Sequence, residues 1–209
     1  TLSSVPDAQT ILNLTPDEVL SLGWHCATGH VIAVWHGNQA ILKTPSGQLI
    51  GLQFAEGPIP KYGSFIKAIG LPESDLYHIN LIKASWTELN SSHYQGPSPK
   101  NISVKEITAY EKDALINANY HGKPIRLSGS IKDVSFSNRI LLLECENQII
   151  PIDATAQPEI LNLVESGCQV SVSGICILEQ ENGHGNSLFP KLKRCTLAIR
   201  SPQDIKIIS

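Results

Sequence analysis

Apolar and polar residues alternate along much of the second half of the chain. Ile125, Leu127 and Ile131 alternate with polar residues, which is the period of two expected of a strand with one buried face. Similar runs cover residues 139–144, 148–154, 169–178 and about 188–199. Between the third and fourth runs, residues 158–165 carry the apolar spacing of a helix. The pattern predicts five strands and one connecting helix in this half.

The first half of the chain repeats this organisation at an offset of 100 residues. Residues 29–34 align with 129–134, and the alignment runs without a gap to Ile50 and Ile150. Residues 63–70 then align with 167–174, so the second copy has four extra residues between its third and fourth strands, where the helix is predicted. A glycine inside a strand weakens it unless a bend is needed. We therefore expect the first strands to coil strongly at Gly29 and Gly129.

Each copy is also preceded by a helix-start signature. Thr15 stands three residues before Glu18, and Ser103 three residues before Glu106. In a capping box the hydroxyl accepts from the third amide of the helix, and the Glu side chain reaches back to the cap. Both signatures predict a short helix ahead of the first strand.

Residues 91–101 lack periodicity and concentrate Ser, Gly and Pro, which is typical of a linker. We therefore expect two domains, at 1–90 and 102–209. Five strands with a coiled first strand, a hairpin between the second and third, and a helix before the fourth describe the oligonucleotide/oligosaccharide-binding (OB) barrel. The predicted fold is all-β with short helices, as two tandem five-stranded OB-like barrels. A small sandwich or SH3-like barrel is the alternative.

Composition narrows the range of partners. The chain has 209 residues, 16 Lys and Arg against 19 Asp and Glu, and a net charge of −3. A nucleic-acid groove needs a sustained positive track, so this balance disfavours one. The five cysteines form no C-x-x-C motif, and no metal or cofactor is expected. Cys176 and Cys195 fall on the fourth and fifth strands and are the pair to examine if the compartment is oxidising.

The repeat places the loops that commonly bind ligands in OB barrels, those between strands one and two and between four and five. In the first copy these loops contain Trp35, His36, Tyr77 and His78. Aromatic planes beside polar tips suit a sugar ring or a base, so these four residues are the candidate ligand site. The alternative is that Trp35 and Tyr77 only close the barrel end by packing.

A second candidate surface comes from comparing the two copies. Phe65 and Ile69 align with Gln169 and Ser173, on the face expected to point outward. An apolar stripe in such a place usually marks a contact surface. We therefore expect Phe65 and Ile69 to contact the other domain or a partner chain.

Four segments carry a resemblance to a known class of receptor. Residues 22–34, 118–134, 167–176 and 199–205, which include the closing Ser201-Pro-Gln-Asp204, resemble the paired OB-like repeats that precede the membrane span in large bacterial sensor histidine kinases. The resemblance implies an extracytoplasmic sensing region that is anchored to a membrane, and joined to a kinase, outside this segment. The absence of Met, including at position 1, leads us to expect a processed chain or a fragment.

The function we expect is therefore non-enzymatic sensing of a small molecule or a protein partner in the periplasm. The sequence contains no Gly-x-Ser-x-Gly motif, no activated-cysteine signature and no glycine-rich phosphate-binding loop, so no motif in it favours catalysis. One alternative is a single-stranded nucleic-acid binder that stacks bases on Trp35, Tyr77 and Phe136. Another is a structural adaptor without a small ligand.

Overall fold

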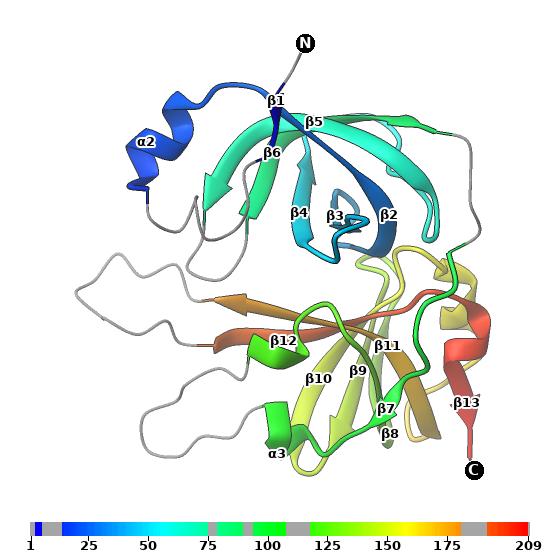
Figure 1. The fold of residues 1–209 in the computed structure, drawn as a ribbon. Helices are drawn as coiled ribbons and strands as arrows, with labels where there is room; N and C mark the ends of the chain where they lie inside the picture. The colour runs from blue at the N-terminus through cyan, green and yellow to red at the C-terminus, as the bar shows by residue number, and fades with distance from the viewer. Residues whose placement is uncertain are drawn as a thin grey trace. The chain divides into compact units, whose positions relative to one another are not determined.

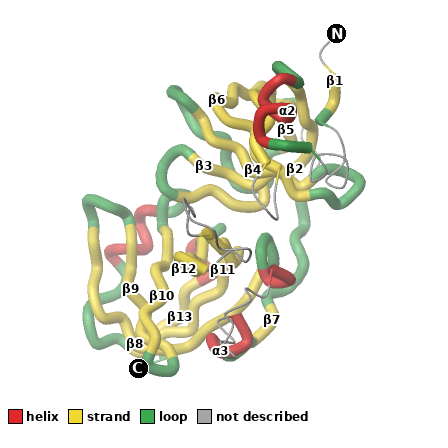
Figure 2. Tube along the Cα trace, turned by 90° about the vertical axis from the view of Figure 1, so that its left-hand side faces the viewer, coloured by secondary structure: helices red, strands yellow, loops and turns green. Residues whose placement is uncertain are grey.

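The computed structural model describes residues 3–5, 14–74, 79–89, 94–107, 118–180 and 192–208. It divides into two compact units, Thr1–Gly96 and Pro97–Ser209. Strands dominate both units and the helices are short (Figure 2). Within the described part of the chain, no helix is both long and apolar enough to cross a membrane.

The first unit consists of strands with one described α-helix ahead of the main barrel strands (Figure 1). Its elements are β1 (Ser3–Ser4), α2 (Pro16–Ser21), β2 (His25–Trp35), β3 (Gln39–Lys43), β4 (Leu49–Phe54), β5 (Phe65–Ser74) and β6 (Ile79–Glu88). Strands pair in the order β1-β2-β3-β4-β6-β5, and β5 also pairs with β2. That last pairing closes a five-stranded barrel, with β1 added alongside β2.

The second unit repeats this plan and adds one strand. Its elements are β7 (Lys100–Asn101), α3 (Val104–Ile107), η1 (Ala118–Tyr120), β8 (Pro124–Ser135), β9 (Ile140–Cys145), β10 (Gln148–Asp153), η2 (Pro158–Asn162), β11 (Gln169–Gln180), β12 (Leu192–Ala198), η3 (Pro202–Asp204) and β13 (Ile205–Ile207). Here β11 pairs with β8 and closes the barrel, while β7 and β13 extend it.

One pairing identifies the topology of both barrels. β4 runs parallel to β6, and β10 runs parallel to β12, whereas the other barrel strands pair antiparallel. Strands three and five are therefore parallel neighbours, and strands one and four close the ring. This is the OB arrangement, so the predicted fold class is confirmed.

The duplicated glycines occupy equivalent places in the two barrels. A Cβ atom added at Gly29 would overlap the carbonyl oxygen of Lys43, and one added at Gly129 would overlap that of Glu144. Shortly after each glycine the pairing shifts by one residue, between Val31 and Ala33 in the first unit and at the matching step in the second. The expected bend of the first strand is confirmed, and its cause is a bulge beside a close backbone approach.

The gap-free alignment from residue 34 to residue 50 is wrong in the second strand. Val31 lies opposite Leu42, but Ile131 lies opposite Leu143 rather than Leu142. The turn after β8 is one residue longer than the turn after β2, and the following hairpin turn is shorter in the second unit. Both barrels are back in step at Ile50 and Ile150, which pair with Leu42 and Leu143. Two compensating turn lengths hide the shift from the sequence.

The two helix caps form as predicted, with one difference. The Thr15 amide donates to Glu18 Oε2 (2.7 Å), and the Glu18 amide donates to Thr15 Oγ1 (3.3 Å). In the second unit the Ser103 amide donates to Glu106 Oε1 (3.1 Å), but Ser103 Oγ accepts from the Lys105 amide instead. The Thr15 hydrogen bonds lower the pKa of Glu18.

Two expected boundaries differ from the structure. Lys100 and Asn101, assigned to the linker, form β7 and pair with Ile125 and Arg126. The insertion at 158–165 is a 3₁₀-helix over Pro158–Asn162 rather than a longer α-helix. Its residues Ile160 and Leu161 are buried in the core of the second barrel, so the insertion caps the barrel as part of its core.

Candidate binding surfaces

The predicted loop site in the first unit is only partly described. Trp35 is 6% exposed, and its indole Nε1 has no hydrogen-bond partner among the described residues. His36 is exposed in the β2–β3 turn with a left-handed backbone (φ 52°). The burial of Trp35 favours its packing role over a role as an open stacking platform. Tyr77 and His78 lie outside the described residues.

The outer face of β2 and β5 instead carries a group of rings from separate parts of the first unit. His30 lies opposite Phe65 across the two strands, and their ring centroids are 4.7 Å apart. The ring of Tyr94 lies 5.1 Å from that of His30, and the ring of Tyr62 lies 6.1 Å from that of Tyr94, edge to face. We call His30, Tyr62, Phe65 and Tyr94 the aromatic surface.

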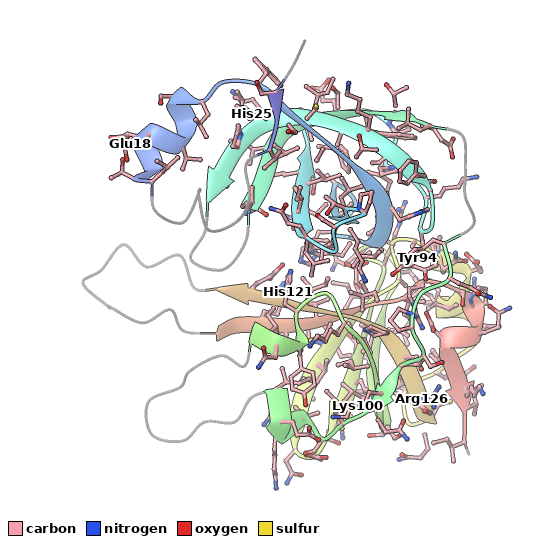
Figure 3. All side chains as sticks on the ribbon, viewed as in Figure 1. Glu18, His25, Tyr94, Lys100, His121 and Arg126 are labelled. Atoms are coloured by element: carbon pink, nitrogen blue, oxygen red, sulfur yellow. The ribbon has the colours of Figure 1, made fainter. Side chains whose placement is uncertain are left out.

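The aromatic surface is anchored but not buried. All four side chains are half-buried, and the position of Tyr94 can be followed in Figure 3. A hydrogen bond of 3.3 Å joins His30 Nδ1 to the Gly63 carbonyl oxygen, and because a carbonyl only accepts, Nδ1 carries the proton. Edge-to-face and tilted pairs hold rings in fixed orientations. These rings are therefore held in place while part of each remains accessible.

Phe65 belongs to this surface, whereas Ile69 lies further along β5. Ile69 is half-buried opposite Cys26. The expectation that Phe65 and Ile69 contact the other domain or a partner chain stays a prediction.

The same face of the second barrel has a different chemistry. Ser130 lies opposite Gln169, Ser128 opposite Ser171, and Arg126 opposite Ser173, at the positions that carry His30–Phe65, Thr28–Lys67 and Cys26–Ile69 in the first barrel. We call this set of β8 and β11 residues the hydroxyl face. The two outer faces thus differ most at one position, where His30 and Phe65 carry rings and Ser130 and Gln169 carry polar side chains.

A shallow hollow of about 490 Å³ opens on the hydroxyl face. It is lined by Asn101, Ile102, Arg126, Ser128, Cys145, Glu146 and Ser171. Arg126 Nε donates to Ser173 Oγ at 3.0 Å, and Glu146 Oε2 accepts from Ser103 Oγ at 2.6 Å. Figure 3 labels Arg126 and Lys100 in this unit. The hollow therefore offers hydroxyl, amide, guanidinium and carboxylate groups to a small polar molecule.

Among the described residues of the second unit, the titratable groups with shifted pKa values show no sign of nucleophilic activation. Burial raises the pKa of the Cys145 thiol, which keeps the thiol protonated and unreactive. Tyr120 Oη donates to Glu106 Oε2 at 2.6 Å, and this bond lowers the pKa of Glu106 and raises that of Tyr120. Among the described residues, no group of three or more His, Cys, Asp or Glu side chains could hold a metal ion.

Sequence reasoning missed Tyr62 and Tyr94 because neither lies in a predicted strand or ligand loop. Tyr62 precedes β5, and Tyr94 lies in the stretch assigned to the linker. The sequence did carry one signal for this surface. His30 and Phe65 differ in chemistry from Ser130 and Gln169, which occupy the equivalent positions on the same face of the second barrel. Only the three-dimensional course of the loop and the linker shows which rings join that pair.

No protein-family model matches the chain, and no curated protein matches it. A solved structure described as "Structural mimicry for functional antagonism" is 12% identical, with a TM-score of 0.34, over 94% of this chain and 100% of its own. A crystal structure of a tetrameric HIN2 is 9% identical, with a TM-score of 0.33, over 90% of this chain and 96% of its own. The assignment of the barrels rests on their strand pairing.

Proposed function

We propose that this chain is a non-enzymatic recognition region whose first barrel binds a neutral, ring-bearing ligand, a saccharide, on the aromatic surface. The observation that carries the proposal is the divergence of one outer face between two barrels of the same topology. His30 and Phe65 stand where the second barrel has Ser130 and Gln169. A purely structural duplication has no need for four half-exposed rings at that face.

The charge of the protein favours a neutral ligand. Net charge is −3, so a polyanion meets no general attraction. Sugar rings present apolar C–H faces together with hydroxyl groups, and they fit an aromatic plane beside a polar tip. The tyrosine hydroxyls and the His30 ring supply such tips. The OB barrel is also a scaffold that binds oligosaccharides.

The test is calorimetric titration of the chain with cellotetraose, maltotetraose and chitotetraose. We expect one of the three to bind in the micromolar to millimolar range. Replacement of Tyr62 or Tyr94 by Ala should weaken that binding by at least about fivefold, because a ring stacked on an aromatic side chain contributes on the order of 1–3 kcal/mol.

The matched control is Ser128→Ala together with Ser171→Ala, which alters the same face of the second barrel. These variants should bind the tetrasaccharide as the unaltered chain does. Failure of all three sugars to bind, or equal weakening by the control, contradicts the proposal.

We also propose that recognition serves signalling outside the cytoplasm. The support is the resemblance of residues 22–34, 118–134, 167–176 and 199–205 to the paired repeats of bacterial sensor kinases. A ligand then acts by binding two arrangements of the receptor with different affinities. Sequencing of the native gene tests this part of the proposal. We expect it to encode a membrane span and a signalling domain after Ser209, and their absence would overturn this part.

Single-stranded nucleic acid is the second candidate ligand, and one observation favours it. Phe136 is 60% exposed in the turn that follows β8, a loop that contacts ligands in OB barrels. Fluorescence anisotropy with a 15-nucleotide oligo-dT distinguishes this candidate. Binding that weakens steeply between 50 and 200 mM salt, as phosphate contacts require, and that Phe136→Ala abolishes, would replace the saccharide proposal.

A further inference from the structure

The second barrel buries two thiols against each other. Cys176 on β11 and Cys195 on β12 place their Sγ atoms 3.8 Å apart, and the residues are 0% and 6% exposed. We propose that Cys176 and Cys195 form a disulfide when the protein folds in an oxidising compartment. This inference is independent of which ligand the first barrel binds.

The strand register places the two cysteines on one face. Cys176 lies opposite Leu197, and Cys195 lies opposite Leu178, so the cysteines are diagonal neighbours across an antiparallel pair. All four side chains belong to the core of the second barrel. A disulfide bond is about 2.05 Å long, so the sulfur atoms need to approach by about 1.8 Å. Diagonal neighbours lie farther apart than directly opposite ones, so the two strands also need to shift toward each other. The ladder is irregular directly beyond Leu178, between Glu179 and Gln180, which is where a strand adjusts most easily.

The barrel fold itself does not require this pair. The equivalent positions of the first barrel are Pro72 and Ile79, which lie opposite Leu81 and Ser74 in the matching register. A proline and an aliphatic side chain therefore fill the same place there. The barrel therefore accepts other side chains at that place, and two thiols in contact are side chains that can also be linked covalently.

The reaction is a two-step thiol–disulfide exchange, with a small-molecule disulfide such as oxidised glutathione as the oxidant. One cysteine thiolate attacks the glutathione disulfide and releases one reduced glutathione. The other thiolate then attacks the mixed disulfide and releases the second glutathione. Overall the glutathione S–S bond breaks, the protein S–S bond forms, and the two thiol protons pass to the two released glutathione sulfurs.

The folded, reduced barrel resists this reaction. The contact with Cys195 and burial both raise the pKa of Cys176, which keeps its thiol protonated. We therefore expect the disulfide to form during folding, before the core closes, and to be shielded afterwards.

The test is refolding of the full chain with oxidised and reduced glutathione, compared with refolding in a strong reductant. The oxidised sample should be lighter by two hydrogen atoms, and peptide mapping should find Cys176 linked to Cys195. The bond closes a loop across a separation of 19 residues. The thermal unfolding midpoint of the oxidised sample should therefore exceed that of the reduced sample by at least about 5 °C.

Variants separate this pair from the other thiols. Cys168→Ser should keep the mass change and the thermal shift, whereas Cys176→Ser and Cys195→Ser should lose both. Peptide mapping of the unaltered chain decides the matter even if a serine variant fails to fold. The proposal is overturned if all five cysteines of the oxidised, denatured sample react with an alkylating reagent, or if the linked peptides contain other cysteines.

Discussion

Gly29 and Gly129 leave no room for even one side-chain atom between neighbouring strands. A Cβ atom there would overlap the carbonyl oxygen of Lys43 or Glu144, which belong to the backbone of the neighbouring strand and cannot rotate away. We expect Gly29→Ala and Gly129→Ala each to lower the free energy of unfolding by about 1–3 kcal/mol, the usual cost of overpacking. Urea denaturation of each variant measures this.

The control for the glycine prediction is Ser128→Ala. Ser128 is the neighbour of Gly129 on β8, and its side chain is exposed on the outer face. This change should alter the free energy of unfolding by less than about 0.5 kcal/mol. A glycine variant as stable as the Ser128 variant would mean that the strands move apart without cost.

Single residues also show what the sequence could reveal. Gly29 and Gly129 were predictable because a glycine inside an alternating strand is unusual and occurs twice. The contact between Cys176 and Cys195 was predictable as a pairing of strands four and five, although not its distance. The positions of Tyr62 and Tyr94 on the aromatic surface could not be predicted, because irregular segments carry no periodicity that relates them to β2 and β5.

The segment that joins β12 to β13 depends on one ion pair. Arg200 Nε and Nη2 donate to the two oxygens of Asp204 at 3.0 and 2.7 Å, and the side chains are only 12% and 7% exposed. Asp204 Oδ2 also accepts from the Arg200 amide at 2.9 Å. This pair orders η3, after which β13 adds to β11.

Asp204→Asn keeps the shape of the side chain but leaves the Arg200 guanidinium without its charged partner. Removing one partner of a buried pair costs about 3–5 kcal/mol, so we expect a loss near that range in urea denaturation. Glu144→Gln is the comparison, because the Lys132–Glu144 pair is 50% and 36% exposed and surface pairs contribute at most about 1 kcal/mol. Equal losses would show that the turn does not depend on burial of its ion pair.

At the level of elements, strand existence was easier to predict than strand register. Alternation locates β8 and β9 because each has one face in the core, whereas β11 is buried at every position from Val172 to Leu178. The shift in the alignment of β3 with β9 arises in the turns, where a residue is added after β8 and residues are removed before β10. Turns carry no buried side chains to report their length, so an ungapped alignment crossed them unnoticed.

For the whole molecule, the sequence repeat predicted the architecture because core positions must recur wherever a barrel recurs. The side chains of the outer faces could not be predicted in the same way, because outer faces are free to differ. His30 and Phe65 stand where the second barrel has Ser130 and Gln169, whereas Thr28 and Ser128 both carry a hydroxyl group. The repeat therefore fixes the scaffold and leaves the outer face of each barrel to vary.

Because the second unit closes its own barrel, we expect residues 97–209 to fold alone. Its core joins residues from α3, η2 and the five barrel strands, among them Val104, Ile160 and Leu197, and its described strands form one sheet of their own. Circular dichroism of residues 97–209 should show a single cooperative thermal transition. A gradual, non-cooperative change would mean that the second barrel depends on the first for its stability, and the two units would then be one folding domain.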